Sequence, residues 1–171
     1  MRKALALFAL ISTIIISSSD ARSSIIQKPK PSPNFKINNT TNHTNAQTCS
    51  FSVKITTSCS SVSYTRDEIS ISFGDAYGNQ VYAPRIDDPS SRAFERCSSD
   101  TYEIYGPCTY EICYLDVYRS GYDGWKLEKV DIYAYNTRRT DSFYFNVWIP
   151  ANVWYGIDDC YYYRSSAAAQ K

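Results

Sequence analysis

The chain has 171 residues, of which 43% are hydrophobic and 15% aromatic, and its formal charge is +1 at pH 7. This length accommodates one ordinary domain with extensions and argues against a second full domain. The balanced charge excludes the strongly basic class of nucleic-acid-binding proteins. The 16 Tyr and 6 Cys residues favour a β-rich protein that is stabilised by disulfides.

Residues 1–21 have the pattern of a secretory signal peptide. Arg2 and Lys3 precede an apolar run from Ala4 to Ile16, and the small residues Ser19 and Ala21 predict cleavage after Ala21. A helix over this run spans about 20 Å, which is short of a bilayer core of about 30 Å. We therefore expect a secreted protein without a transmembrane segment after removal of the signal peptide.

Residues 22–48 are expected to form a disordered linker. Pro29, Pro31 and Pro33 alternate in this stretch, and no apolar period is sustained. Three overlapping N-glycosylation motifs begin at Asn38, Asn39 and Asn42. The stretch contains four basic residues and no acidic residue, namely Arg22, Lys28, Lys30 and Lys36. These charges could make weak contacts with an anionic polymer or membrane, but a solvated spacer is the preferred interpretation.

All six cysteines lie between residues 49 and 160, and this interval is expected to be the folded domain, followed by a tail over residues 161–171. An even number of cysteines behind a signal peptide predicts three disulfides, whose pairing the sequence leaves open. We expect the pairs Cys49 with Cys160, Cys59 with Cys97, and Cys108 with Cys113. A zinc site is disfavoured, because the interval has no Cys-x-x-Cys motif and no His.

Apolar residues in this interval recur with a period of two, which is typical of strands that bury one face. The expected strands cover residues 51–56, 69–73, 81–85, 94–97, 101–105, 113–118, 130–135 and 143–149. Turn signals rich in Gly, Pro, Asn and Asp separate them. Eight short strands that each have one apolar face bury those faces by stacking two sheets. The sequence therefore predicts an all-β, eight-stranded antiparallel β-sandwich.

Several motifs in this interval resemble the PLAT, or lipoxygenase-homology, domain. They are Ile69–Asp75 with Gly78, then Phe94, Asp100 and Thr101, then Cys113–Arg119, and finally Gly121–Val130. The last of these, Gly-x-x-Gly-Trp-x-Leu-Glu-x-Val, is the most specific. More narrowly, the chain resembles plant embryo-specific secreted proteins that are built around such a domain.

The resemblance implies an eight-stranded sandwich that mediates lipid, membrane or protein association without catalysis. It also implies a location in the extracellular space or cell wall, with a role in seed or embryo development. Trp125 occupies the family's structural position in the turn, and Gly74 and Gly124 are expected to have structural roles as well.

Enzymatic activity is not expected. Without a His, the domain cannot assemble a Ser-His-Asp or Cys-His site. Two carboxylate pairs, Asp87 with Asp88 and Asp158 with Asp159, remain as an acid and base for glycoside cleavage. Such pairs are common in acidic loops, and no catalytic residue is assigned.

Calcium is the one cofactor considered. The interval from Cys49 to Cys160 has 10 Lys and Arg against 16 Asp and Glu, so nucleic acids and anionic lipids would repel it. A bridging cation would overcome that repulsion at a membrane, and the resemblance points the same way, since several PLAT domains bind lipid through loop calcium. The candidate ligands are the oxygen-bearing side chains of Asp75, Asn79, Asp87 and Asp88. Ordinary solvated turn residues are the preferred interpretation.

Aromatic side chains provide a second kind of candidate site. Several fall opposite the apolar faces of their strands or on a turn, namely Tyr114, Tyr118, Tyr133, Tyr135, Tyr144, Trp148 and Tyr122. Exposed rings stack on sugars and anchor protein interfaces. Trp154, like Trp125, is expected to pack in the fold. The preferred function is a secreted, non-catalytic module that binds a protein or glycoprotein; calcium-assisted lipid binding and carbohydrate binding are the alternatives.

Overall fold

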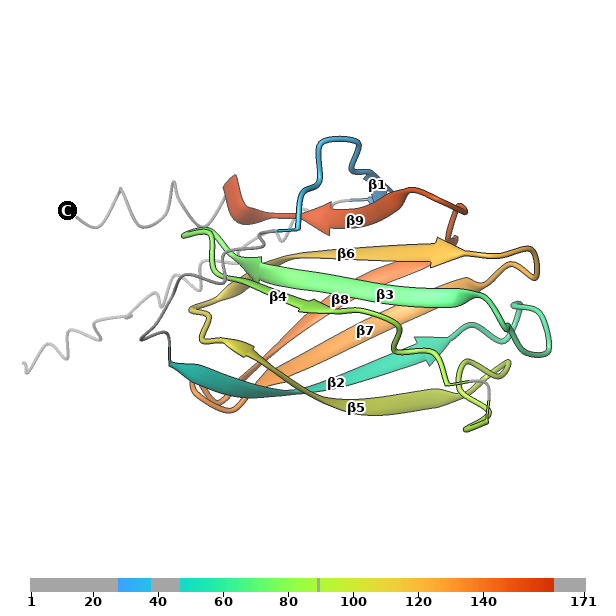
Figure 1. The fold of residues 1–171 in the computed structure, drawn as a ribbon, viewed down its shortest axis with the longest axis horizontal. Coiled ribbons are helices and arrows are strands. Elements are labelled where there is room, and N and C mark those ends of the chain that lie inside the picture. Colours follow the sequence, from blue (N-terminus) through green and yellow to red (C-terminus); the bar gives the residue numbers. More distant parts are fainter. Residues whose placement is uncertain (1–27, 38–46, 89, 162–171) are drawn as a thin grey trace, which may run out of the picture.

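The computed structural model describes residues 28–37, 47–88 and 90–161, which form nine strands in two antiparallel sheets (Figure 1). Sheet A has the order β1 (Lys30–Pro31), β9 (Trp154–Asp158), β6 (Ile112–Ser120), β3 (Glu68–Asp75), β4 (Gln80–Ala83). Sheet B has the order β5 (Ser99–Pro107), β2 (Thr48–Thr57), β7 (Lys126–Ala134), β8 (Arg139–Trp148). The predicted all-β sandwich is confirmed. The expected signal peptide, the three glycosylation motifs and residues 162–171 lie outside the described residues.

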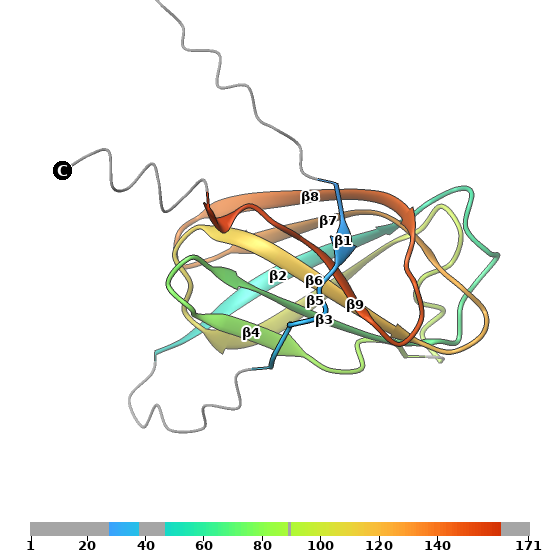
Figure 2. The same ribbon diagram turned by 90° about the horizontal axis from the view of Figure 1, so that it is seen from above.

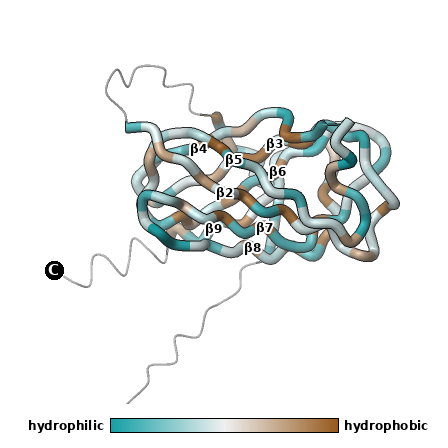
Figure 3. The backbone as a smooth tube through the Cα atoms, turned by 90° about the horizontal axis from the view of Figure 1, so that it is seen from below, coloured by the Kyte–Doolittle hydropathy of each residue, from teal (hydrophilic) through white to brown (hydrophobic). Residues whose placement is uncertain are grey.

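The core lies between the two sheets, and alternation of inward and outward side chains builds it, most clearly along β2. In β2, Phe51, Val53 and Ile55 are fully buried, while the residues between them face outward. Across the core, the Phe51 ring meets Phe73 of β3 edge-on, with ring centroids 5.2 Å apart. Hydrophobic and hydrophilic bands accordingly alternate along the tube in Figure 3. Within the described residues, no helix has the length and hydropathy needed to cross a bilayer.

Two details of the expected strand set are wrong. Residues 94–97 form a turn, in which Phe94 and Cys97 have φ values of 61° and 62°. Phe94 is nevertheless buried, with its ring centroid 5.0 Å from that of Trp125. A turn, and not a strand, therefore places this side chain in the core. The sequence analysis missed β9, because its sequence Trp-Tyr-Gly-Ile-Asp does not alternate apolar with polar residues.

Part of the expected linker is structured. Residues 28–37, here called the strap, contain β1, which pairs with β9 through Lys30 opposite Gly156 and Pro31 opposite Tyr155. The sequence analysis missed this strand because β1 has only two residues and the strap has no apolar period. Pairing with β9 holds the strap in place, and no apolar pattern within the strap predicts its strand.

The disulfides join Cys49 to Cys108, Cys59 to Cys97, and Cys113 to Cys160. The pair Cys59–Cys97 is confirmed. The pairs Cys49–Cys160 and Cys108–Cys113 are wrong, because Cys49 lies in sheet B and Cys160 follows a strand of sheet A. Cys49 lies opposite Gly106 on the neighbouring strand β5, close to Cys108, and Cys113 on β6 lies beside the end of β9. Each of these two bridges therefore joins neighbours within one sheet.

Candidate functional site

The turn at residues 121–124 delivers Trp125 into the core at one end of the sandwich. Trp125 is fully buried, and its indole N–H donates to the hydroxyl of Thr57 over 3.0 Å. Gly124 has a φ of +79°, in the left-handed region where a side chain would be strained. The most specific motif of the chain is thus an element of folding and not an exposed site.

A buried ion pair organises the same turn. The carboxylate of Asp67 is paired with the guanidinium of Arg119, and it accepts the backbone N–H groups of Asp123 at 3.0 Å and Gly124 at 3.1 Å. Burial alone would raise the pKa of Asp67, but the hydrogen bonds from Asp123, Arg119 and Gly124 outweigh burial and hold that pKa below its usual value. The sequence analysis assigned no role to Asp67 or Arg119, because their partners come from distant strands.

Asp75 and Asn79 do lie together, but they organise the β3–β4 turn. One carboxylate oxygen of Asp75 accepts the backbone N–H groups of Tyr77 at 2.9 Å and Asn79 at 3.1 Å. The other accepts the Asn79 side-chain amide at 2.7 Å and the backbone N–H of Tyr110 at 2.9 Å. Gly74 precedes them, and a Cβ there would lie 2.2 Å from the Asn79 carbonyl oxygen, so only glycine fits.

Asp87 and Asp88 lie near the other end of β3. Asp87 accepts the backbone N–H of Ile69 at 2.8 Å and forms an ion pair with Arg85 at 3.0 Å. Asp88 is exposed, and hydrogen bonds from the Ser90 hydroxyl and backbone lower its pKa.

The four candidate ligands therefore do not form one site. In the part of the chain that the structure describes, no group of three or more His, Cys, Asp or Glu side chains is arranged to hold a metal ion. Each of the three carboxylates already accepts hydrogen bonds, Asp75 and Asp88 from their own turns and Asp87 from Ile69 of β3, and Asp87 is paired with Arg85 as well. The residues present do not fit a calcium cage, which requires about six to eight oxygen ligands.

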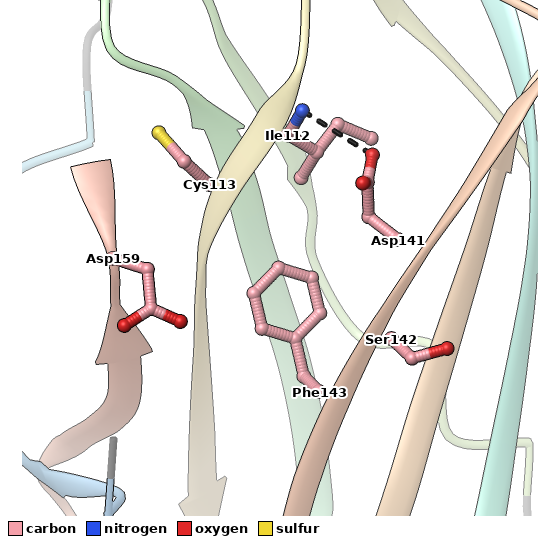
Figure 4. Close-up of a pocket in the computed structure, with 6 residues that line it drawn as sticks. All are labelled: Ile112, Cys113, Asp141, Ser142, Phe143 and Asp159. Atoms are coloured by element: carbon pink, nitrogen blue, oxygen red, sulfur yellow. Dashed lines mark hydrogen bonds between the residues drawn. The ribbon is translucent and has the colours of Figure 1, made fainter. Parts of the chain in front are cut away.

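The neighbouring carboxylates of Asp158 and Asp159 differ in exposure. Asp158 is exposed, whereas Asp159 lines a small pocket with Asp141 and Phe143, on the opposite side of the β6 ribbon from Asp141 (Figure 4). Asp141 accepts the backbone N–H of Ile112 at 3.3 Å and is paired with Arg139 at 3.3 Å. Burial raises the pKa of both Asp141 and Asp159. The pairing expected for a glycosidase, Asp158 with Asp159, does not face a common cleft.

The outer face of sheet B carries a set of exposed rings, here called the aromatic face. Its members come from three strands or their ends and are Tyr105, Tyr133, Tyr135, Tyr144 and Trp148. Exposed fractions of 69%, 55% and 52% for Tyr105, Tyr144 and Trp148 show that they are not rim residues of the core. The register spreads them along the sheet: Tyr105 lies opposite Ser50 and Tyr133 opposite Ser52 near one end, whereas Tyr144 lies opposite Lys129 and Trp148 opposite Lys126 toward the other end.

Contacts on the aromatic face orient its rings. Tyr133 and Tyr135 meet edge-on with centroids 4.9 Å apart, and the Tyr135 hydroxyl donates to Glu103 over 3.4 Å. The Lys129 ammonium lies 4.9 Å from the centroid of the Tyr144 ring and 2.7 Å from the Asp131 carboxylate. The face thus combines ring surface with charges of both signs. Between the rings, the outward positions of β2 carry small or polar side chains, namely Ser50, Ser52, Lys54 and Thr56.

The remaining aromatic candidates lie elsewhere. Tyr114 and Tyr118 face outward from β6 on sheet A, and Tyr122 is fully exposed on the turn before Trp125. Trp154, which was expected to pack in the fold, lies half-buried on the outer face of sheet A against Tyr118 and Phe35. The sequence analysis missed Tyr105, although its alternation with buried Ile104 in β5 was a usable signal.

The known proteins with sequences similar to this chain are described as embryo-specific proteins. Residues 36–160 match the family described as Embryo-specific protein 3 (ATS3). The chain is 56% identical over 158 residues to Embryo-specific protein ATS3A of Arabidopsis thaliana, which covers 90% of this chain and 83% of that protein. It is 49% identical over 154 residues to ATS3B of the same plant, covering 90% of this chain and 80% of that protein.

Solved structures extend the likeness in fold to the PLAT domains of lipoxygenases. Coral 8R-lipoxygenase matches with a TM-score of 0.53 and 22% identity, covering 63% of this chain and 17% of the enzyme. The alpha toxin of Clostridium absonum matches with a TM-score of 0.53 and 20% identity, covering 70% of this chain and 33% of the toxin. Fold, sequence and motif agree: the chain belongs to the plant embryo-specific protein 3 family and has a PLAT-like β-sandwich.

Proposed function

We propose that the protein is a secreted, non-catalytic binding module that holds an extracellular protein or glycoprotein on the aromatic face. The observation that carries the proposal is that four rings about half or more exposed lie on the same outer face of sheet B along its length, namely Tyr105, Tyr135, Tyr144 and Trp148. Tyr and Trp anchor interfaces because they bury a large area at a small cost in conformational entropy. Exposed rings clustered on one surface mark an interaction site.

The character of this face favours a protein or glycoprotein partner. Its rings are interleaved with hydroxyl groups and with the Lys129–Asp131 pair, so a partner finds both stacking surface and hydrogen-bonding groups. Flat sheets of this kind suit extended contact with a macromolecule better than enclosure of a small molecule.

Three features support export by way of the signal peptide over residues 1–21. The first is the charged and apolar pattern of those residues. The second is the set of three disulfides, which persist in oxidising compartments. The third is the group of glycosylation motifs at Asn38, Asn39 and Asn42 in the segment that precedes the sandwich.

The test is quantitative capture of partners from native extracellular fluid with immobilised mature protein. The double variant Tyr144→Ala/Trp148→Ala removes two exposed anchors from the aromatic face. It is expected to lose at least about tenfold in partner affinity and to keep the melting temperature of the parent. Tyr77→Ala, which removes a ring that is 71% exposed on the β3–β4 turn of sheet A, is the control. Equal retention of the same partner by both variants contradicts the proposal. A glycan array with the same proteins tests the carbohydrate alternative.

Calcium-assisted lipid binding is the second candidate, and it is favoured by the relationship in fold to coral 8R-lipoxygenase, which is described as activated by calcium through a C2-like domain. The hydrogen bonds that Asp75 accepts from Asn79 and Asp87 accepts from Ile69 disfavour it. We expect millimolar calcium to leave the melting temperature and liposome co-sedimentation unchanged. A calcium-dependent rise in either measurement, abolished by Asp88→Asn, would establish the lipid-binding function instead.

A further inference from the structure

The outer face of sheet A is not open, because the strap crosses it. Starting from β9, Ser32 donates its backbone N–H to the Trp154 carbonyl over 2.9 Å. At the far edge, the Gln80 side chain donates to the Lys36 carbonyl over 3.2 Å. Since β9 and β4 are separated by β6 and β3, the strap spans the sheet, as Figure 2 shows from above.

The strap packs against aromatic side chains and a buried carboxylate on the outer face of sheet A; we call this surface, with the strap removed, the strap groove. Its aromatic side chains include Tyr82, Tyr118 and Trp154, and the ring centroids are 6.2 Å apart for Tyr82–Trp154 and 5.4 Å apart for Tyr118–Trp154. The strap's Phe35 ring lies 4.4 Å from the Trp154 ring. The carboxylate is that of Asp116, which accepts a hydrogen bond of 2.5 Å from the Ser32 hydroxyl.

The chemistry of the groove is that of a recognition site. Asp116 projects to the outer face, yet it is only 6% exposed. A buried carboxylate contributes less to stability than an apolar side chain of similar size, whereas it discriminates strongly between ligands that do and do not donate to it. Aromatic side chains, in turn, are the usual partners of extended, proline-containing segments, which lose little conformational entropy on binding.

The strap matches this groove in charge and is weakly fastened to it. It contributes Lys28, Lys30 and Lys36 and no acid, against a sandwich with more Asp and Glu than Lys and Arg. Its strand pairing with β9 is limited to two residue pairs. A short edge segment with so few backbone contacts opens at low free-energy cost compared with the core strands.

We propose that the strap groove is a peptide-binding site for a basic, proline-containing extended segment of a partner protein, and that the strap occupies this site in cis. The partner segment places a hydroxyl group on Asp116 and an aromatic ring on Trp154, three residues further along, as Ser32 and Phe35 do. This site lies on sheet A, so the inference is independent of the aromatic face on sheet B.

The experiment measures binding of a fluorescent peptide with the sequence of residues 28–37 to the full mature chain by anisotropy. The double variant Ser32→Ala/Phe35→Ala weakens the strap and is expected to bind the peptide at least tenfold more tightly than the parent chain, whose own strap competes at high effective concentration. Phe35→Ala alone serves as host if the double variant does not unfold cooperatively.

Three controls locate the binding. Adding Trp154→Ala to the strap-weakened host is expected to reduce affinity at least tenfold, while adding Tyr122→Ala leaves it unchanged. A peptide in which Lys30 and Lys36 are replaced by Glu is expected to bind at least tenfold more weakly than the native peptide. Absence of saturable binding, or binding that Trp154→Ala does not affect, overturns the proposal. A strap-exchanged dimer of the parent chain in light scattering also overturns it, because the occupant would then be a second copy.

Discussion

Asp67 and Arg119 form an ion pair whose side chains are only 3% and 10% exposed, and it ties β6 to the loop before β3 and to the turn before Trp125. Arg119 is further engaged by the Ile149 carbonyl, which accepts from its Nε over 2.8 Å. By contrast, the pair of Arg85 with Glu68 is more than half exposed. Burial decides which of these pairs matters for stability.

Replacing Asp67 with Asn is expected to lower the free energy of unfolding by about 3–5 kcal/mol, because it leaves the Arg119 charge buried without a counter-ion. The control Glu68→Gln, which breaks the exposed pair, is expected to cost no more than about 1 kcal/mol. Urea denaturation under non-reducing conditions measures both. Similar costs for the two substitutions would show that the buried pair has no special role.

The pKa of Asp67 also sets a direction for pH dependence. Because its pKa is lowered in the fold, the Asp67 carboxylate stabilises the folded protein above its usual pKa, and this contribution is lost as the pH falls through the lowered value. The Asp67→Asn variant should therefore lose less stability on acidification than the parent.

At the scale of elements, β6 carries a carboxylate whose effect on stability responds to pH in the opposite direction. Burial raises the pKa of Asp116 to about 6, against the hydrogen bond from Ser32 and with a further contribution from Asp158. A raised folded pKa makes the contribution of Asp116 to the stability of the folded chain largest below about pH 4, and this contribution falls as the pH rises through about 6. The charge of Asp116 in turn contributes to the raised pKa of Tyr114 on the same strand.

Between pH 4.5 and pH 7.5, the free energy of unfolding of the parent chain is expected to fall relative to that of the Asp116→Asn variant, which cannot ionise. Urea denaturation at the two pH values measures the difference. An equal pH dependence in the parent and the variant would assign the effect to Asp158 or to another group.

The strands at one edge of sheet A were not predicted from the sequence. Both β1 and β9 lie at one edge of sheet A, and neither alternates apolar with polar residues. An edge strand is stabilised by pairing with its neighbour, so its own side chains carry a weak signal. The converse error, a strand over residues 94–97, arose because buried Phe94 is supplied by a turn.

For the whole molecule, the disulfides tie each sheet together separately at Cys49–Cys108 and Cys113–Cys160. Peptide mapping without reduction is expected to recover these two bridges and Cys59–Cys97. The double variant Cys113→Ser/Cys160→Ser is expected to destabilise the fold by about 2–4 kcal/mol, because the unfolded chain regains the conformational entropy that closing this loop, with a sequence separation of 47, removes. Recovery of a peptide that links Cys108 to Cys113 would show that the sheets are bridged differently.

The sequence was sufficient to predict the sandwich, because alternation of apolar and polar residues is a local property that specifies a strand and its buried face. Phe51, Val53 and Ile55 reveal their common orientation without reference to any other strand. The burial of Trp125 was predicted differently, from the resemblance of the Gly121–Val130 motif to the PLAT family.

Only the tertiary structure decided which strands are neighbours, and hence what their outward faces can do. The order β1-β9-β6-β3-β4 is far from sequential, so the cysteine pairing, the placement of Tyr105, Tyr133 and Tyr144 on one face of sheet B, and the docking of Ser32 on Asp116 depend on contacts between distant segments. Alternation identifies which side chains of a strand point outward, but it does not identify the neighbouring strands. It therefore cannot specify which outward side chains lie together.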